Sequence, residues 1–328
     1  MLMRSRPLLA AAALLFGSGL LVSHPSEAQP QAWPTKPILM IVPYSAGGPT
    51  DVIARLIAKQ AGTDLGQSIV VDNRGGAGGT IGVNAAVKSP PDGYTFTMTG
   101  PGPIAGMPNL MKMPYAPADY QYVTLVARVP SVIVVNASAG YKDLGDFINK
   151  AKAAPGKLNY GSAGAGTTPH IGAELFKQQA GLDIVHVPYK GASVAVTALL
   201  GNEVQVAMLD LAPVLPQVTA GKLKILAVAG NMRAPQIPDV PTTSELGLPG
   251  VLMDTNYGVV APKGVAPEIT KKLREAVVAA LASAEVKEQF LKLGAIATAS
   301  TPEEYAKLMA SENEKWHTVV TKGKITLD

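Results

Sequence analysis

Short apolar segments alternate with amphipathic segments along most of this chain. Between Thr50 and Thr63, for example, Ile53, Leu56 and Ile57 recur at helical spacing and directly follow an apolar run at 37–44. Further strand-like runs lie at 68–73, 94–100, 158–164, 183–189, 204–210, 223–230 and 256–262. Such regular alternation predicts parallel α/β sheets covered by helices. A longer β-rich stretch, 120–136, is split by Pro130.

The first 28 residues have the three parts of a secretory signal. Arg4 and Arg6 precede an apolar stretch at 8–22, and Ser26-Glu27-Ala28 forms a small-x-small cleavage site. The apolar stretch is short for a membrane span, and a buried N-terminal helix is the weaker alternative. We therefore expect export to the periplasm with cleavage near Ala28. The absence of cysteine excludes disulfides and thiolate metal sites.

Removal of residues 1–28 leaves 300 of the 328 residues, which suits two lobes better than one core. Only 5% of the chain is aromatic while 47% is hydrophobic, so the core is built mainly from aliphatic side chains. The net charge is +4, and no basic stripe with interleaved aromatic residues occurs, which argues against nucleic-acid binding. A mildly positive protein suits a small anionic ligand, and we expect a monomer.

Four predicted strand-to-helix junctions share one chemistry, because each combines glycine with a hydroxyl at a helix start. They are 45–51 (SAGGPTD), 75–80 (GGAGGT), 161–169 (GSAGAGTTP) and 189–193 (YKGAS). A helix N-terminus presents unpaired N–H groups and partial positive charge, and glycine lets a ligand approach the backbone. One such loop alone is usually an ordinary βα connection. Four together indicate two lobes that offer donors to one cleft, where an acid with carboxylates at both ends would fit.

Motifs for other functions fail on spacing. No G-x-G-x-x-G dinucleotide fingerprint, phosphate-binding P-loop or G-x-S-x-G nucleophile elbow is present. His170 and His186 lack metal-ligand spacing, so a structural or cleft role is favoured over zinc. A Ser162/His170/Asp210 triad can be written down, as in any chain of this length, and we give it little weight. We expect no cofactor, no metal and no catalytic residue.

Taken in order, the stretches PYSAGGPTDVIARLIA, VVDNRGGAGGTIGVNAAVKSPPDGYT, YGSAGAGTTPHIGAELF and HVPYKG resemble the receptors of tripartite tricarboxylate transporters, also called Bug-type solute-binding proteins. AGKLKILAV, PDVPTTSELGLPG and APKGVAPEI extend the resemblance over nearly the whole chain after residue 33. The resemblance implies a type II periplasmic-binding-protein fold, with two α/β lobes joined by two crossing strands around a ligand cleft. It implies capture of a di- or tricarboxylate or an aromatic acid and its delivery to membrane permease subunits.

From the resemblance we expect lobe 1 to comprise 29–126 plus 255–328, and lobe 2 to comprise 127–254. The resemblance implies ligand-facing positions on both lobes. They are Tyr44, Ser45, Gly48, Thr50, Asp51, Gly79, Thr80, Ser162, Gly166, Thr167, Thr168, Tyr189, Lys190, Asp210 and Asp254.

The sequence leaves alternatives open for two residues, for the ligand and for the function. Asp51 could satisfy the first turn of its helix or could face the ligand. Arg128 could bind a carboxylate or lie on the surface. The sequence departs from the family pattern at 99–108, Leu211 and Asp254, so a bulkier or partly apolar acid is plausible. A sensor that docks on a signalling receptor and an enzyme that acts on a carboxylate are the alternative functions.

Overall fold

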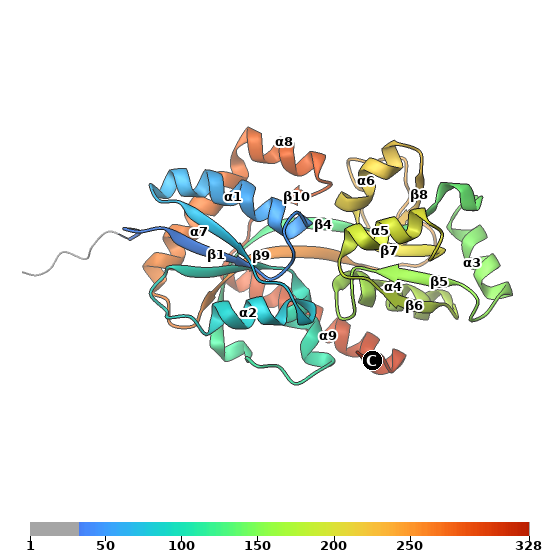
Figure 1. Cartoon of the computed structure of the whole chain (residues 1–328), viewed down its shortest axis with the longest axis horizontal. Helices are drawn as coiled ribbons and strands as arrows, with labels where there is room; N and C mark the ends of the chain where they lie inside the picture. The colour runs from blue at the N-terminus through green and yellow to red at the C-terminus, as the bar shows by residue number, and fades with distance from the viewer. Residues whose placement is uncertain (1–32, 328) are drawn as a thin grey trace, which may run out of the picture. The chain divides into compact units, whose positions relative to one another are not determined.

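The computed structural model describes residues 33–327, and the predicted signal segment with its cleavage point lies outside them. Within these residues, two sheets share one long strand (Figure 1). The continuous strand order is β2-β1-β3-β9-β4-β7-β5-β6, and β8 and β10 pair with β4. The first sheet contains β1 (Ile38–Val42), β2 (Ile69–Asn73), β3 (Thr95–Thr99), β9 (Asp254–Pro262) and β10 (Ile296–Ala297). The second contains β5 (Asn159–Ser162), β6 (Val185–Pro188), β7 (Val206–Asp210) and β8 (Leu223–Val228).

The long strand β4 (Tyr120–Asn136) joins the two sheets. Tyr120 to Pro130 pair antiparallel with β9 in the first sheet, and Ser131 to Asn136 pair antiparallel with β7 and β8 in the second. Pro130 therefore does not break the strand. It lies where the chain changes sheets, so its missing N–H costs little there. Both sheets are mixed, whereas the alternation in the sequence predicts parallel sheets, because β4 and β9 run against their neighbours.

Helices cover the first sheet around an aliphatic core that includes Ile53, Ile57, Val126 and Leu273. These helices are α1 (Pro49–Leu65), α7 (Pro267–Ala282) and α8 (Ala284–Lys292), while α2 (Thr80–Val87) belongs to a separate core cluster through Val83 and Val87. The local sequence explains α1: a proline occupies its first turn, apolar side chains recur every three or four residues, and Gly66 ends it in a left-handed conformation.

The second sheet is packed between helices on both faces. Phe147, Ile171 and Phe176 belong to the core on one face, and Val132, Leu199 and Leu209 to the core on the other. The helices are α3 (Leu144–Ala153), α4 (Thr168–Ala180), α5 (Ala192–Leu200) and α6 (Leu211–Thr219). α6 begins directly after Asp210, and its first turn accommodates Pro213.

The last helix, α9 (Pro302–Gly323), packs on both halves of the molecule. Tyr305 and Met309 join a core cluster with Leu125 of β4 and Val260 of β9. Trp316 and Val319 join the cluster that contains Phe147 of the second half. The lobe boundaries predicted from the sequence assign all of 255–328 to lobe 1, and they remain a prediction. In the structure, the C-terminal part of α9 shares a hydrophobic core with the second sheet.

Short helices that the sequence analysis does not anticipate connect β3 to β4. A π-helical turn covers Gly102–Gly106, and 3₁₀ turns cover Met107–Asn109 and Pro117–Asp119. Two more 3₁₀ turns lie at Ala77–Gly79 and Ala137–Ala139. Across 33–327, every helix is too short or too polar to cross a membrane.

Candidate functional site

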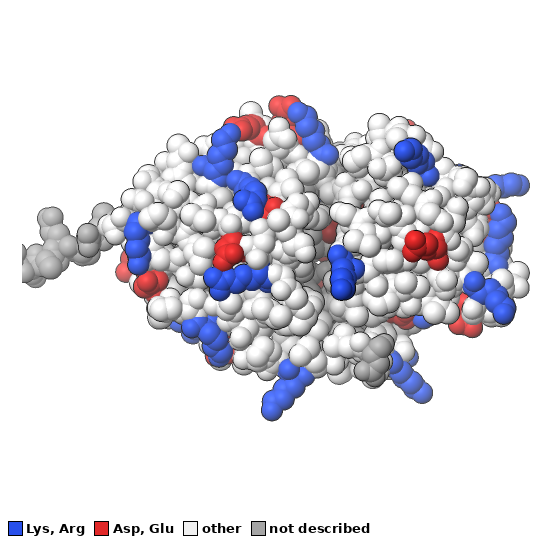
Figure 2. Space-filling view, in the orientation of Figure 1, with Lys and Arg blue, Asp and Glu red and all other residues white. Residues whose placement is uncertain are grey.

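A cleft of about 980 Å³ lies where the ends of strands from both sheets meet. Figure 2 shows a furrow that runs between the two halves of the described chain, with charged side chains scattered over the outer surface of both. The first half contributes residues 43–50, Asn73, 75–79 and Gly100 to the lining. The second half contributes 163–165, 167–169, 189–193 and Asp210, and β9 contributes Thr255 and Tyr257. All four glycine-rich junctions therefore line one cleft.

Four helices follow the glycine-rich junctions at this cleft, and none of the four has a side chain that caps its first turn. Gly48 precedes α1, Gly79 precedes α2, Thr167 precedes α4 and Gly191 precedes α5. A fifth helix, α6, follows Asp210 and also lacks a side-chain cap. By contrast, Asp143, Ser283 and Thr301 cap α3, α8 and α9, whose first turns do not line the cleft. An uncapped first turn leaves N–H groups for water or a ligand. Away from the cleft, α7 also lacks a side-chain cap.

Tyr44 and Gly79 form one wall of the cleft. Gly79 adopts a left-handed φ of 97°, and a Cβ atom there would lie 3.3 Å from the Tyr44 ring. Glycine is therefore required both by the backbone and by the close approach of the ring. Burial raises the pKa of the Tyr44 phenol to about 12, so the group stays neutral and can donate a hydrogen bond.

Asp51 is buried, and its partners lie within its own segment. Its Oδ2 accepts from the Gly47 amide at 2.8 Å, and its Oδ1 lies 2.9 Å from Arg55 Nη2. These contacts outweigh burial and lower the pKa of the carboxyl, so Asp51 stays ionised. Asp51 does not line the cleft, and it orders the 45–50 loop from behind. The sequence allows two roles for Asp51, and these contacts favour the structural role.

Asp210 lies at the end of β7 and is the one carboxylate among the cleft-lining residues. Its Oδ1 accepts from Thr255 Oγ1 at 2.7 Å and from Ser131 Oγ at 3.3 Å, and its Oδ2 accepts from Tyr257 Oη at 3.0 Å. Burial raises the pKa of Asp210 to about 6, although the three hydroxyl donors oppose that shift. The ionised Asp210 carboxylate is thus stabilised by neutral hydroxyl donors alone.

The remaining charges near the cleft are few. Lys190 is exposed and is the one basic residue in the lining. Asp254 does not line the cleft. Its Oδ2 lies 3.1 Å from Arg128 Nη1, where β9 pairs with β4. Arg128 and Asp254 therefore form a half-buried pair beside the strand crossing, and each satisfies the other.

Of the other predicted positions, most line the cleft and a few lie behind its surface. Lining positions are Tyr44, Ser45, Gly48, Thr50, Gly79, Thr167, Thr168, Tyr189, Lys190 and Asp210. Thr80 is buried and donates to Ala77 O at 2.8 Å. Ser162 and Gly166 are buried at the two ends of the loop 163–165. Whether any of these positions binds a ligand remains a prediction.

Sequence reasoning missed several lining residues, among them Asn73, Gly100, Thr255 and Tyr257. Thr255 and Tyr257 lie on β9, far in sequence from the glycine-rich junctions. A signal exists for Asn73 and Gly100, since each is the last residue of a strand-like run, at 68–73 and 94–100.

The Ser162/His170/Asp210 combination is not a triad in the structure. Ser162 Oγ lies 2.7 Å from Nε2 of His186, not of His170, and Asp210 contacts hydroxyl groups. Ser162 is fully buried, so its hydroxyl cannot reach a substrate carbonyl. Among residues 33–327, no group of three or more metal-ligating side chains comes together.

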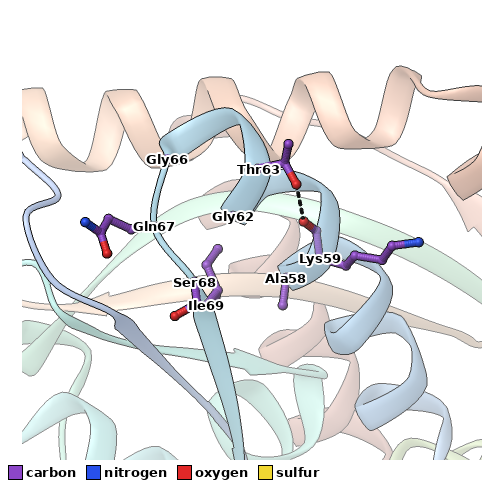
Figure 3. Close-up of a pocket in the computed structure, with 8 residues that line it drawn as sticks. All are labelled: Ala58, Lys59, Gly62, Thr63, Gly66, Gln67, Ser68 and Ile69. Carbon is purple, nitrogen blue, oxygen red and sulfur yellow. Dashed lines mark hydrogen bonds between the residues drawn. The ribbon is translucent and has the colours of Figure 1, made fainter.

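A second hollow, of about 410 Å³, lies at the end of α1 and the start of β2 (Figure 3). Two of its polar side chains already have partners, since Thr63 Oγ1 donates to Lys59 O at 3.1 Å and Lys59 Nζ binds Glu285 at 2.8 Å. The Lys59 side chain extends away from the hollow in Figure 3. The hollow lies at the C-terminal end of α1, so it lacks the open helix N-termini that distinguish the cleft.

The sequence of residues 53–325 matches the model of the tripartite tricarboxylate transporter family receptor. The chain belongs to this receptor family. Protein BugT of Bordetella pertussis is 36% identical over 313 residues, which cover 94% of this chain and 96% of BugT. The family is one of solute-binding receptors rather than of enzymes.

Solved structures of receptors support the same assignment. Rpa4515 of R. palustris, solved with adipate, superposes with a TM-score of 0.84 at 35% identity and covers 90% of this receptor and 99% of that chain. MatC from Rhodopseudomonas palustris, with bound malate, gives 0.81 at 31% identity, with coverages of 88% and 100%. The two-lobed periplasmic-binding-protein fold predicted from the sequence is confirmed.

Proposed function

We propose that this receptor captures a small carboxylate in the cleft between its lobes and delivers it to the permease subunits of a tripartite tricarboxylate transporter in the periplasm. The observation that supports this most directly is the set of four uncapped helix N-termini around one cleft. Oriented N–H groups and partial positive charge bind carboxylates without requiring arginine.

The arrangement favours a ligand with anionic groups at two ends. α1 and α2 bring donors from the first half, and α4 and α5 bring donors from the second. An acid that spans the cleft would therefore bind to both halves and favour a closed form over an open one. Adipate and malate, found in two relatives, are such acids.

A thermal-shift screen of the mature protein tests the proposed ligand class. The panel holds mono-, di- and tricarboxylates, aliphatic and aromatic, together with acidic amino acids and neutral sugars. A ligand at 100 times its dissociation constant adds about 2.7 kcal/mol to the free energy of unfolding, so we expect a clear rise in melting temperature for dicarboxylates. A response to sugars but to no acid would contradict the proposal.

A binding experiment tests the proposed delivery to the permease. The receptor is immobilised and loaded with its ligand, and we expect it to retain the membrane subunits of the transporter.

The Thr167→Ala/Thr168→Ala double variant should bind the acid that the screen identifies at least tenfold more weakly. Hydrogen bonds to a charged group contribute about 1.5–3 kcal/mol, and tenfold corresponds to about 1.4 kcal/mol. Titration calorimetry gives the dissociation constants. Thr197→Ala, an exposed substitution on α5 outside the lining, is the matched control and should bind like the wild type. Unchanged affinity of the double variant would remove both threonines from the site.

A further inference from the structure

Three aromatic rings are stacked beneath the loop 163–167. The ring of His186, on β6, lies between the ring of Tyr160, on β5, and the ring of His170, on α4. The His186 and Tyr160 centroids are 4.7 Å apart with planes inclined by 19°, and the two imidazole centroids are 4.1 Å apart with planes inclined by 11°. The stack thus connects three elements of the second sheet and its helix layer.

The two imidazoles hold the two ends of this loop. Ser162 Oγ, at the start, lies 2.7 Å from His186 Nε2. The Gly166 amide, at the end, donates to His170 Nδ1 at 3.1 Å. Thr167, directly after Gly166, donates from Oγ1 to Gly164 O at 2.7 Å. Residues 163–165, 167 and 168 line the cleft, so the imidazoles fix the backbone that faces the proposed ligand.

The hydrogen bond from Gly166 determines the protonation of His170. A ring nitrogen that accepts a hydrogen bond carries no proton, so the neutral ring must carry its proton on Nε2. An imidazolium would turn the acceptor into a donor that faces the Gly166 N–H. It would also place a positive charge in the first turn of α4, where the helix dipole disfavours it.

The surroundings keep both rings neutral. The titratable groups around the stack are Glu174 and Lys177 of α4 and the Tyr160 phenol of β5. Tyr160 and Lys177 both donate to Glu174, which leaves no carboxylate bonded to either imidazole. Burial, reinforced by Lys177, lowers the pKa of His170 to about 4. Burial and then His170 lower the pKa of His186 to about 3.

We propose that His170 is a positioning residue for the ligand loop, and that its neutral Nδ1 holds the Gly166 amide so that residues 163–168 keep the conformation that binds the acid. His186 does the same for Ser162 at the other end. The consequence for ligand affinity rests on the proposed function, whereas the positioning of the loop does not.

Two substitutions of His170 distinguish the effect of its hydrogen-bond acceptor, Nδ1, from the effect of its ring. His170→Phe keeps a ring in the stack and removes the acceptor. His170→Asn loses the ring, but its side-chain oxygen can take the place of Nδ1. With adipate as the probe, we expect His170→Phe to bind at least tenfold more weakly than the wild type. We expect His170→Asn to bind within about threefold of it, in spite of a lower melting temperature.

A role in packing alone predicts the opposite order, because phenylalanine preserves more of the buried contact than asparagine does. Adipate affinity of His170→Phe equal to that of the wild type, or higher than that of His170→Asn, would overturn the proposal.

A ligand-free experiment tests the positioning separately. We expect nitrogen-15 spectra to show the Nε2–H tautomer of His170 without titration between pH 8 and pH 5. We expect the Gly166 amide to exchange with solvent at least tenfold faster in His170→Phe than in the wild type. A His170 that titrates near 6.5, or unchanged Gly166 exchange, overturns the proposal. If these results appear as expected but no acid binds the wild type, the proposed function fails and the positioning of the loop stands.

Discussion

Replacing Trp316 with alanine is expected to lower the free energy of unfolding by about 3–5 kcal/mol, as large-to-small substitutions of buried aromatic residues do. The Trp316 side chain is fully buried and belongs to the core cluster of the second half. Its ring also lies against the π-helical turn of the first half, since a Cβ atom added at Gly106 would lie 2.0 Å from it. Trp316 therefore anchors α9 to both halves, and its removal would leave a cavity where they meet.

Urea and thermal unfolding followed by circular dichroism measure this loss. Thr318→Ala is the control, because Thr318 is exposed on the same helix and its replacement should change stability by less than about 0.5 kcal/mol. A loss below about 1 kcal/mol for Trp316→Ala would contradict the assigned packing of α9.

The second large effect concerns Asp210 and pH. The pKa of this carboxyl is raised from 3.8 to about 6 in the folded receptor, chiefly by burial. Between these two values the folded state binds more protons than the unfolded state, so stability falls as pH rises through this window. A shift of about two pKa units corresponds to about 3 kcal/mol of stability, which is fully present below the unfolded-state pKa and is lost above about pH 7.

Asp210→Asn should remove most of this dependence. Asparagine resembles the protonated carboxyl: its oxygen can accept from Thr255 and Ser131, and the Tyr257 hydroxyl can turn to accept from its amide. We expect the variant to be more stable than the wild type at pH 8, by up to about 3 kcal/mol, and to approach it near pH 4.5.

Melting temperatures of both proteins between pH 4.5 and pH 8 supply the test. Burial also raises the pKa of Asp254. Asp254 is common to both proteins, so the difference between them retains only the part of its charge effect that raises the pKa of Asp210. A difference that does not change with pH would show that Asp210 is already ionised throughout this range.

Local patterns in the sequence were sufficient for the elements and for much of the candidate site. Hydrophobic spacing reports which face of a segment is buried, so the helix at 50–63 and the strand at 204–210 could be predicted. Glycine, proline and hydroxyl residues at a helix start indicate a first turn whose N–H groups can bind a ligand. The junctions at 45–51 and 161–169 could therefore be predicted to supply hydrogen-bond donors.

Contacts between distant segments could not be predicted in the same way. The passage of β4 through Pro130 depends on the pairing of that residue with Asp254, and α9 packs on both halves because Trp316 meets a core that lies far away in sequence. Asp51 and Asp254 were predicted at the cleft because the family resemblance implies ligand-facing positions there. In the structure, Arg55 and Arg128 bind these carboxylates elsewhere.

The sequence by itself determined the alternating elements, the glycine-rich junctions and the resemblance to transporter receptors. Only the tertiary structure decided which groups meet across these elements: three hydroxyls on Asp210, from β4 and β9, and a backbone amide on the ring of His170. The reason is physical. Periodicity and turn chemistry act between near neighbours, whereas the pKa of Asp210 and the tautomer of His170 depend on burial and on partners that only the folded chain brings within hydrogen-bond distance.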